Sequence, residues 1–389
     1  MTSALRVLIA HPSSDVYGSD LQLVESVRAL TEAGTSVVVS VPGPGPLEPS
    51  LVEAGASVVV EPVPVLRKSL LRPAGLARLA VTAPVCVLRL ARRIRAARPD
   101  VVYVNTVTVP WWIAAARLAR VPVLVHVHEA EESGSLLLRR AVVAPLVAAH
   151  EIVVNSAAAL DAAAIVPGVR RRATVVHNGV PGPGNAAPRA PRGPDAPARL
   201  VLVARLSPRK GIDVAVEATA LLVARGHDVR LDLCGTTFEG YEWYEDELRA
   251  RAARSDLAGR VAFRGYVRPT WGALEEADVV LVPSRTEPFG NTAVEALLAC
   301  RPLVASGVQG LREIVDDGRT GLLVPPGDAQ ALADAVGRLL DDPHEALRLA
   351  LAGREDATER FSPQRYRERV RDVVARVARV RLAREPAAR

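Results

Sequence analysis

A chain of 389 residues, of which 49% are hydrophobic and 24% are charged, is long enough for two domains with full cores and fits a soluble globular protein. Its net charge of +6 is concentrated locally, because nine basic residues and no acidic one fall within residues 64–98. The three cysteines, Cys86, Cys234 and Cys300, have no paired spacing. This pattern argues against a disulfide framework or a metal cluster and favours a reducing cytoplasm.

Neither a secretory leader nor a membrane span is predicted. Residues 6–10 are far too short for a signal peptide and lead straight into a turn. The longest weakly apolar stretch, residues 76–90, is interrupted by Arg78, Pro84 and Arg89. We therefore expect a cytoplasmic protein.

The basic segment 64–98 has two interpretations that the sequence leaves open. It is either a surface helix whose arginine stems cover apolar neighbours, or an interfacial helix attracted to anionic lipid. The second would make the protein peripheral at the inner face of the plasma membrane. Nucleic acid is not expected as a partner, because no aromatic residues alternate with these charges and no binding motif is present.

The first half of the chain alternates short apolar runs with helical segments. Continuous runs of Val, Ile and Leu predict strands buried on both faces, as in a parallel sheet covered by helices. Their repetition predicts a doubly wound, Rossmann-like domain over residues 1–180. The expected strands are 5–10, 36–40, 57–60, 101–104, 121–127, 152–154 and 173–177, and the expected helices are 20–33, 76–97, 110–119 and 161–165 with the alanines before it.

A linker, residues 181–198, is rich in Pro, Gly, Ala and Arg. A second α/β domain is then predicted over 199–362, and a basic helix within 363–389 is expected to cover the first domain. Two such domains would face a central cleft, so the loops that follow strands are the places to look for a ligand. The expected strands are 200–204, 229–233, 261–263, 279–282, 303–305 and 322–324, and the expected helices are 212–224, 243–253, 292–299, 329–340 and 363 to about 384.

The loop after the 200–204 strand reads Arg205-Leu-Ser-Pro-Arg-Lys210-Gly. Its turn residues also suit a simple strand-to-helix connection. However, Lys68 and Lys210 are the only lysines in a chain rich in arginine. A compact ammonium at a loop–helix junction, five residues after Arg205, suits a diphosphate.

A second loop, between the 279–282 strand and a helix expected to begin at Thr292, carries Glu287 and the turn residue Gly290. A strand, a tight loop and a helix N-terminus together predict a phosphate-binding position. Glu287 is placed to reach sugar hydroxyls. Glu295 has two open interpretations, because it either contacts a ligand or forms a capping box with Thr292. The two loops together predict a sugar-nucleotide site.

This combination resembles the donor-site signature of the retaining glycosyltransferase family 4, the group 1 glycosyltransferases, which have the GT-B fold of two Rossmann-like domains. The resemblance rests on Arg205, Lys210, Glu287 and Glu295. It covers the C-terminal domain almost end to end, through Pro302-Leu-Val-Ala-Ser, Gly310-Leu-Arg-Glu-Ile-Val and Gly321-Leu-Leu-Val-Pro-Pro-Gly. Cys300 stands where the family usually has glycine, and we expect altered packing there without loss of activity.

The resemblance implies a retaining transfer of a hexosyl-type sugar from a nucleotide-diphosphate sugar to a hydroxyl acceptor, with no metal or other cofactor. Arg205 and Lys210 would hold the diphosphate and stabilise the leaving group. Glu287 would bind the transferred sugar, and Glu295 the ribose. Further donor contacts are implied for Tyr266 and Val267, which would hold the base, and for Phe289, Gly290, Asn291 and Thr292.

Weaker signals lie in the N-terminal domain. Gly18 and Ser19 occupy the place of the family's glycine-rich loop, against donor and acceptor. They lack its usual double glycine, and a lone Gly-Ser pair is also an ordinary helix cap. His128 matches the histidine that the family places beside the reacting sugar, although it could instead be a buried histidine bonded to backbone. Asn105, at the end of a strand, is a candidate acceptor contact together with Ser19.

The sequence also bears on other functions. His126 and His128 share one face of a strand and could hold a metal, but the family that the chain resembles is metal-independent. A dehydrogenase is disfavoured, because no Gly-x-Gly-x-x-Gly turn follows the first strand. A sugar-nucleotide epimerase of GT-B type and a non-catalytic partner subunit remain as alternatives. The acceptor expected is a cell-envelope, polysaccharide or lipid-linked glycan precursor.

Overall fold

The structure is a computed structural model that describes residues 4–66, 73–130, 134–190, 196–238 and 240–382. It divides into two compact units, one formed by Met1–Gly179 with Pro363–Arg389 and the other by Val180–Ser362. Parts of three predicted segments lie outside the described residues. They are residues 67–72 of the basic segment, 191–195 of the linker and 383–389 after the last helix.

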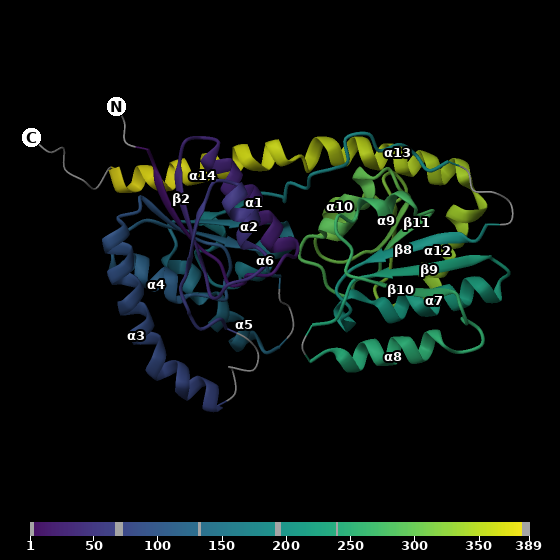
Figure 1. Cartoon of the computed structure of the whole chain (residues 1–389), viewed down its shortest axis with the longest axis horizontal. Coiled ribbons are helices and arrows are strands. Elements are labelled where there is room, and N and C mark those ends of the chain that lie inside the picture. The colour runs from purple at the N-terminus through teal and green to yellow at the C-terminus, as the bar shows by residue number, and fades with distance from the viewer. Residues whose placement is uncertain (1–3, 67–72, 131–133, 191–195, 239, 383–389) are drawn as a thin grey trace, which may run out of the picture. The chain divides into compact units, whose positions relative to one another are not determined.

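The N-terminal unit contains a seven-stranded sheet in the order β3-β2-β1-β4-β5-β6-β7, and all of its pairs are parallel. Helices cover both faces (Figure 1), and two apolar clusters fill the space between helices and sheet. The strands are β1 Arg6–Ala10, β2 Ser36–Val41, β3 Ser57–Val60, β4 Val101–Val104, β5 Val123–Val127, β6 Glu151–Val154 and β7 Ala173–Val175. The helices are α1 Gly18–Thr31, α2 Glu48–Glu53, α3 Pro73–Ala97, α4 Trp111–Leu118, α5 Leu136–Val143, α6 Ala157–Ala163 and α14 Pro363–Leu382.

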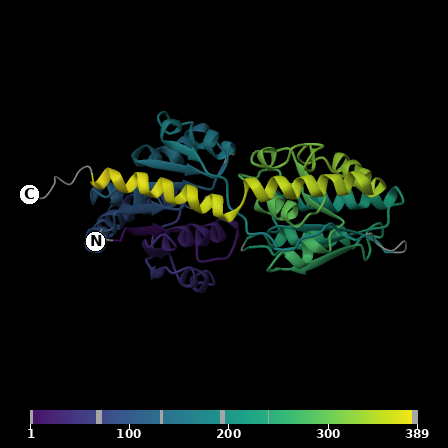
Figure 2. The ribbon, with the colours of Figure 1, turned by 90° about the horizontal axis from the view of Figure 1, so that it is seen from above.

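The last helix, α14, packs against α1 and against β4 and β5 of this unit, and Figure 2 shows it running across the sheet. Tyr366 is 2% exposed, and its hydroxyl lies 2.6 Å from the Ser26 hydroxyl. Arg367 pairs with Glu25 at 2.7 Å and with Glu32 at 2.9 Å. Helix α14 therefore contributes to the apolar core of the N-terminal unit.

The C-terminal unit contains a six-stranded parallel sheet in the order β10-β9-β8-β11-β12-β13. The order reverses between β8 and β11, which is the arrangement of a doubly wound fold. The strands are β8 Ala198–Val203, β9 Val229–Cys234, β10 Val261–Gly265, β11 Val279–Val282, β12 Leu303–Ser306 and β13 Leu322–Val324. The helices are α7 Ile212–Ala224, α8 Glu242–Ala252, α9 Trp271–Glu275, α10 Asn291–Leu298, α11 Leu311–Ile314, α12 Ala329–Asp341 and α13 Pro343–Arg360.

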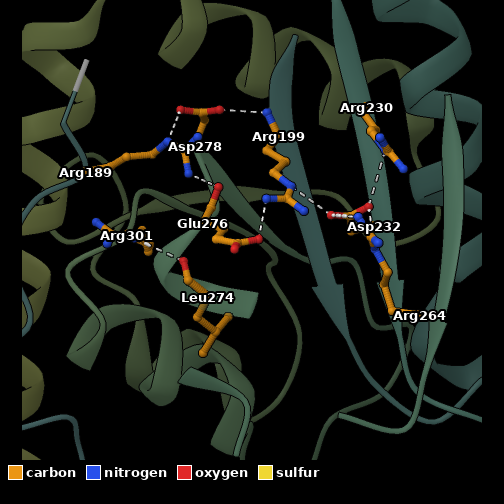
Figure 3. Close-up of polar contacts among 9 residues, drawn as sticks. All are labelled: Arg189, Arg199, Arg230, Asp232, Arg264, Leu274, Glu276, Asp278 and Arg301. Atoms are coloured by element: carbon orange, nitrogen blue, oxygen red, sulfur yellow. Dashed lines mark hydrogen bonds and ion pairs between the residues drawn. The ribbon is translucent and has the colours of Figure 1, made fainter. Parts of the chain in front are cut away.

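An arginine-rich network holds the predicted linker to the C-terminal unit (Figure 3). Arg189 pairs with Asp278 at 2.8 Å. The buried Arg301 donates to the carbonyls of Ala187 and Leu274, both at 3.0 Å. Asp278 and Arg301 precede β11 and β12, so the network lies away from the loops that follow these strands. The network thus fixes the linker without occupying the edge where a ligand is expected.

The two Rossmann-like units confirm the predicted fold class, and every predicted strand is present with shifts of a few residues at its ends. Some boundaries were wrong. Helix α6 begins at Ala157, within the predicted alanines, where Ser156 caps it by accepting from the amide of Ala159. It ends at Ala163, however, before the predicted residues 164 and 165. Four short or polar helices were not predicted: α2, α5, α9 and α11, and the longer α13 was missed as well. No helix among the described residues is long and apolar enough to cross a membrane.

Candidate functional site

The strand order of the C-terminal sheet reverses between β8 and β11, and the two loops singled out in the sequence follow these strands. In open parallel sheets, ligands bind at this position because the two loops turn away from each other there. A small cavity of about 10 Å³ lies at this point. It is lined by the ends of both strands and by Lys210, Glu287 and Thr292.

Lys210 and Glu287 are brought together from loops 77 residues apart, with the ammonium 2.5 Å from Oε2 of the carboxylate. The Ser284 hydroxyl also donates to Oε2, at 3.2 Å. Burial raises the pKa of Glu287, but the charges of Lys210 and Arg209 outweigh burial and the net pKa lies below its usual value. Glu287 is therefore a carboxylate at neutral pH, and Lys210 is its counter-ion.

At Gly211, the loop after β8 passes so close to the loop after β11 that no side chain fits between them. Gly211 has φ of +66°, and a Cβ there would lie 2.0 Å from the carbonyl oxygen of Pro283. Arg285 joins the same two segments, because its amide donates to the Arg209 carbonyl at 2.8 Å and its guanidinium pairs with Asp213 at 2.6 Å. Backbone contacts thus determine where Lys210 lies relative to Glu287.

Helix α10 begins at Asn291 rather than at Thr292, and no side chain caps it. Its N-cap is Gly290, whose φ of +121° is open to glycine. The capping box, one of the two interpretations left open for Glu295, does not form, because the Thr292 hydroxyl donates instead to the carbonyl of Val203 at 3.2 Å. A helix start without a side-chain cap is a position that favours an anion.

Glu295 accepts a hydrogen bond from the Thr270 hydroxyl at 3.3 Å. Burial raises the pKa of Glu295 to about 7, and the Thr270 contact opposes that rise only in part. A half-buried carboxyl with one weak donor lacks the partners that would stabilise its charged form. Glu295 takes no part in capping α10. Its carboxyl group is therefore available to hydroxyl groups of a ligand.

The other donor residues predicted in the C-terminal unit lie in the loops that follow β8, β10 and β11 and at the start of α10. The Arg205 guanidinium is 5.8 Å from the centre of the Phe238 ring, in the loop after β9. Tyr266, after β10, is exposed, whereas Val267 packs on the core. Phe289 is buried, with its ring 5.6 Å from that of Phe361, so its backbone alone can face a ligand. Asn291 and Thr292 form the first turn of α10.

In the N-terminal unit, Asn105 and His128 follow β4 and β5, which are neighbours in the sheet, and His128 Nε2 lies 3.0 Å from Asn105 Oδ1. Gly18 and Ser19 form the exposed first turn of α1. His126 points from β5 to the hydroxyl of Tyr103 at 2.7 Å. In the part of the chain that the structure describes, no group of three or more His, Cys, Asp or Glu side chains could hold a metal ion.

Sequence reasoning missed several side chains that organise these sites. His11 and Asp20 are buried and bonded to each other at 2.7 Å. Gln309, whose φ is +38°, accepts from the amide of Glu287 at 2.8 Å. A polar residue directly after a buried strand, as His11 is after β1, was the available signal. Nothing local marked Thr270 or Gln309.

The chain is similar to known proteins in sequence and in fold. The family description "Glycosyl transferases group 1" matches residues 197–342, and "Glycosyl transferase 4-like domain" matches residues 18–179. The chain is 34% identical over 287 residues to a glycogen synthase of Mycobacterium tuberculosis, covering 69% of this chain and 67% of that protein. An alpha-D-kanosaminyltransferase of Streptomyces kanamyceticus is 33% identical over 153 residues, which is 39% of this chain and 38% of that one.

Solved structures share the fold along nearly the whole chain. HepE of Anabaena in complex with UDP and glucose has a TM-score of 0.80 at 23% identity, and the match covers 95% of this chain and 99% of that one. Sucrose-phosphate synthase from Thermosynechococcus elongatus has a TM-score of 0.74 at 20% identity, with coverage of 96% and 99%.

The fold is therefore GT-B, and the protein is a glycosyltransferase that uses nucleotide sugars. The chain belongs to the group 1 glycosyltransferases, family 4.

Proposed function

We propose that the protein transfers a hexosyl-type sugar from a nucleotide-diphosphate sugar to a hydroxyl acceptor with retention of configuration and without a metal. The Lys210–Glu287 pair at the reversal point of the sheet carries this proposal. A diphosphate would draw the ammonium away from the carboxylate. Glu287 would then accept hydrogen bonds from hydroxyls of the sugar, so one pair would serve both halves of the donor.

Positive charge on the C-terminal unit would perform the role that a metal has in other transferases. As the bond from the anomeric carbon to the diphosphate breaks, negative charge grows on the leaving oxygens. Lys210, Arg205 and the N-terminal amides of α10 would stabilise that charge. The acceptor oxygen would form its bond on the same face of the sugar, and its proton would pass to the departing phosphate.

In the N-terminal unit, His128 would contact the transferred sugar, and Gly18 would lie against the donor phosphate. Ser19 and Asn105 were predicted to contact the acceptor. Asn105 is 1% exposed, and its two polar atoms already bond to His11 and His128. Of the two, Ser19 is thus the one whose exposed side chain suits direct contact with an acceptor.

The stereochemical test is the configuration of the product. Proton NMR of the first-formed glycoside should show the anomeric coupling of the donor, and activity should survive excess chelator. An inverted anomer would overturn retention. Loss of activity in chelator that is restored by a divalent cation would overturn metal independence.

Glu295 predicts a pH dependence of donor binding. Ribose hydroxyls would donate to its ionised form, and burial holds the pKa of the free enzyme's Glu295 at about 7. At pH 6 the carboxyl must first lose its proton, which costs about 1.4 kcal/mol. We expect the Kd for a nucleotide sugar to fall about tenfold from pH 6 to pH 8, with release of a proton. Glu295→Gln should remove this dependence, as calorimetry in two buffers would reveal. Equal wild-type affinity at both pH values would contradict this role.

A membrane-facing surface is proposed on α3. Its exposed apolar side chains Val81, Val85 and Leu88 are 72%, 66% and 51% exposed, and they share one helical face. Arg89 and Arg93, which flank this face, pair with Glu61 at 3.2 and 2.6 Å. Part of the basic charge on α3 is therefore neutralised within the unit. The proposal rests instead on the exposed apolar side chains Val81, Val85 and Leu88. It would suit a lipid-linked or cell-envelope acceptor.

Vesicle flotation tests this surface. The protein should float with vesicles that contain phosphatidylglycerol, and replacing Val81, Val85 and Leu88 together by serine should abolish flotation. The matched control variant replaces Leu347 and Leu351 by serine. These two residues of α13 are 42% and 48% exposed, and the control protein should still float. Wild-type protein that stays at the bottom of a low-salt gradient would exclude peripheral binding.

A further inference from the structure

A continuous chain of polar side chains crosses the N-terminal unit from α1 to the end of β5. Asp20 Oδ1 lies 2.7 Å from His11 Nε2. The other ring nitrogen of His11, Nδ1, lies 3.1 Å from Asn105 Nδ2. Asn105 Oδ1 in turn lies 3.0 Å from His128 Nε2. Asp20, His11 and Asn105 are each at most 2% exposed, so their hydrogen bonds are shielded from water.

The charge at one end gives this chain a direction. A carboxylate only accepts, so His11 donates to Asp20 from Nε2. The other ring nitrogen, Nδ1, faces the NH2 group of Asn105, which only donates. Asn105 must then donate its N–H to His11 and present its carbonyl oxygen to His128. The Asp20 charge is itself held in place, because Oδ2 accepts from the Tyr17 amide at 2.9 Å in the first turn of α1, where the helix dipole favours an anion.

His128 ends the chain with one nitrogen unused. Burial lowers the pKa of His128 to about 3, so the imidazole is neutral and carries a single proton. Its Nδ1 is buried and has no hydrogen-bond partner among the described residues. The neighbouring His126 ring lies 4.0 Å away. Its Nδ1 is bonded to Tyr103, and its Nε2 is buried and makes no hydrogen bond to His128.

We propose that Asp20, acting through His11 and Asn105, holds His128 in the tautomer protonated on Nε2. His128 Nδ1 is then a hydrogen-bond acceptor, and it selects a ligand that offers a hydroxyl proton at this point. Asp20, His11 and Asn105 are positioning residues. The hydroxyl is one of the transferred sugar, a step that rests on the proposed function, whereas the tautomer does not.

Asp20→Asn is the sharpest variant, because the new carboxamide has the shape of the carboxylate. Its oxygen can still accept from the Tyr17 amide, but its NH2 group faces His11. His11 must then accept on Nε2 and donate from Nδ1, which turns the Asn105 amide over. The reversed chain places the proton of His128 on Nδ1.

Two-bond ¹H–¹⁵N correlation spectra of the full chain report the tautomer directly, with the His128 signals assigned by their loss in His128→Gln. We expect a protonated Nε2 in the wild type, a protonated Nδ1 in Asp20→Asn and a mixture in Asn105→Ala. Wild-type His128 protonated mainly on Nδ1 overturns the proposal whether or not the variants fold. An unchanged tautomer in a folded Asp20→Asn protein overturns the role of Asp20.

Deoxyfluoro donor analogues test the proposed hydrogen bond to His128 Nδ1, because a fluorine that replaces a hydroxyl has no proton to donate. Among 3-, 4- and 6-deoxyfluoro donors, one should lower wild-type kcat/KM by at least about tenfold relative to the parent sugar. In Asp20→Asn, the ratio of kcat/KM for the parent donor to kcat/KM for that analogue should be about threefold or less. An unchanged ratio in the variant overturns the proposed selection. Absence of transfer with every donor, beside the expected NMR result, would count against the proposed function and not against the tautomer.

Discussion

Lys210→Ala is expected to lower kcat/KM by about a hundredfold or more. A charge-assisted contact that strengthens on a departing anion is worth about 2–4 kcal/mol, and each 1.36 kcal/mol is a factor of ten in rate. The substitution also leaves the buried Glu287 carboxylate without its ammonium, at the place where the diphosphate would bind. Steady-state kinetics with the preferred donor measure the loss.

The control for Lys210→Ala is Arg225→Ala, which removes a cation from the same unit. Arg225 lies at the end of α7 and pairs with the largely exposed Asp334 at 2.7 Å. Its loss should change kcat/KM by less than about twofold. The double variant Lys210→Ala/Glu287→Gln should bind donor better than Lys210→Ala and remain slow. A Lys210→Ala enzyme within about threefold of wild type would contradict the role given to this ammonium.

Glu287→Gln should separate binding of the nucleotide from use of the sugar. The carboxylate competes with a diphosphate for Lys210 in the free enzyme, since the two side chains are 2.5 Å apart. Its neutralisation should leave the Kd for a free nucleoside diphosphate unchanged or lower it. Transfer should fall by about 10- to 100-fold, because a hydrogen bond to a charged group is worth about 1.5–3 kcal/mol. Calorimetry and kinetics on the same variant give the two numbers.

A loss of transfer without a loss of affinity for the free nucleotide is the distinguishing result. If Glu287→Gln weakens free nucleotide as much as it weakens sugar transfer, the carboxylate acts by organising the loop and not by holding sugar. Ser284→Ala removes the other donor to Glu287 Oε2 while leaving the ion pair. It serves as the matched control for disturbance of the loop.

The strands and the two donor loops could be predicted because their signals are local. Buried parallel strands read as continuous apolar runs, and Lys210 and Glu287 stand in loops between such runs and helices. The helix start at Thr292 was mispredicted for a non-local reason. A Cβ at Gly310 would lie 2.5 Å from the Phe289 Cα and from the Pro288 carbonyl oxygen. This close approach of two backbone segments, with Gly290 at positive φ, determines where the helix begins.

The contacts that organise the N-terminal unit were beyond local reasoning. His11 and Asn105 are 94 residues apart, and Ser26 meets Tyr366 across 340 residues. No periodicity encodes such pairs, because they depend on how the strands are ordered in the sheet. Glu295 shows the same limit, since its partner Thr270 lies before α9, a helix that the sequence did not predict.

The most direct test of the account is release of nucleoside diphosphate by the wild-type chain from a panel of UDP-, GDP-, dTDP- and ADP-sugars, with a sugar alcohol or water as acceptor. The account predicts turnover with at least one donor and a product that carries the sugar in its original configuration. An epimerised donor in place of a transferred sugar would favour a GT-B epimerase. Donor binding without turnover of any kind would contradict the account and indicate a non-catalytic partner subunit.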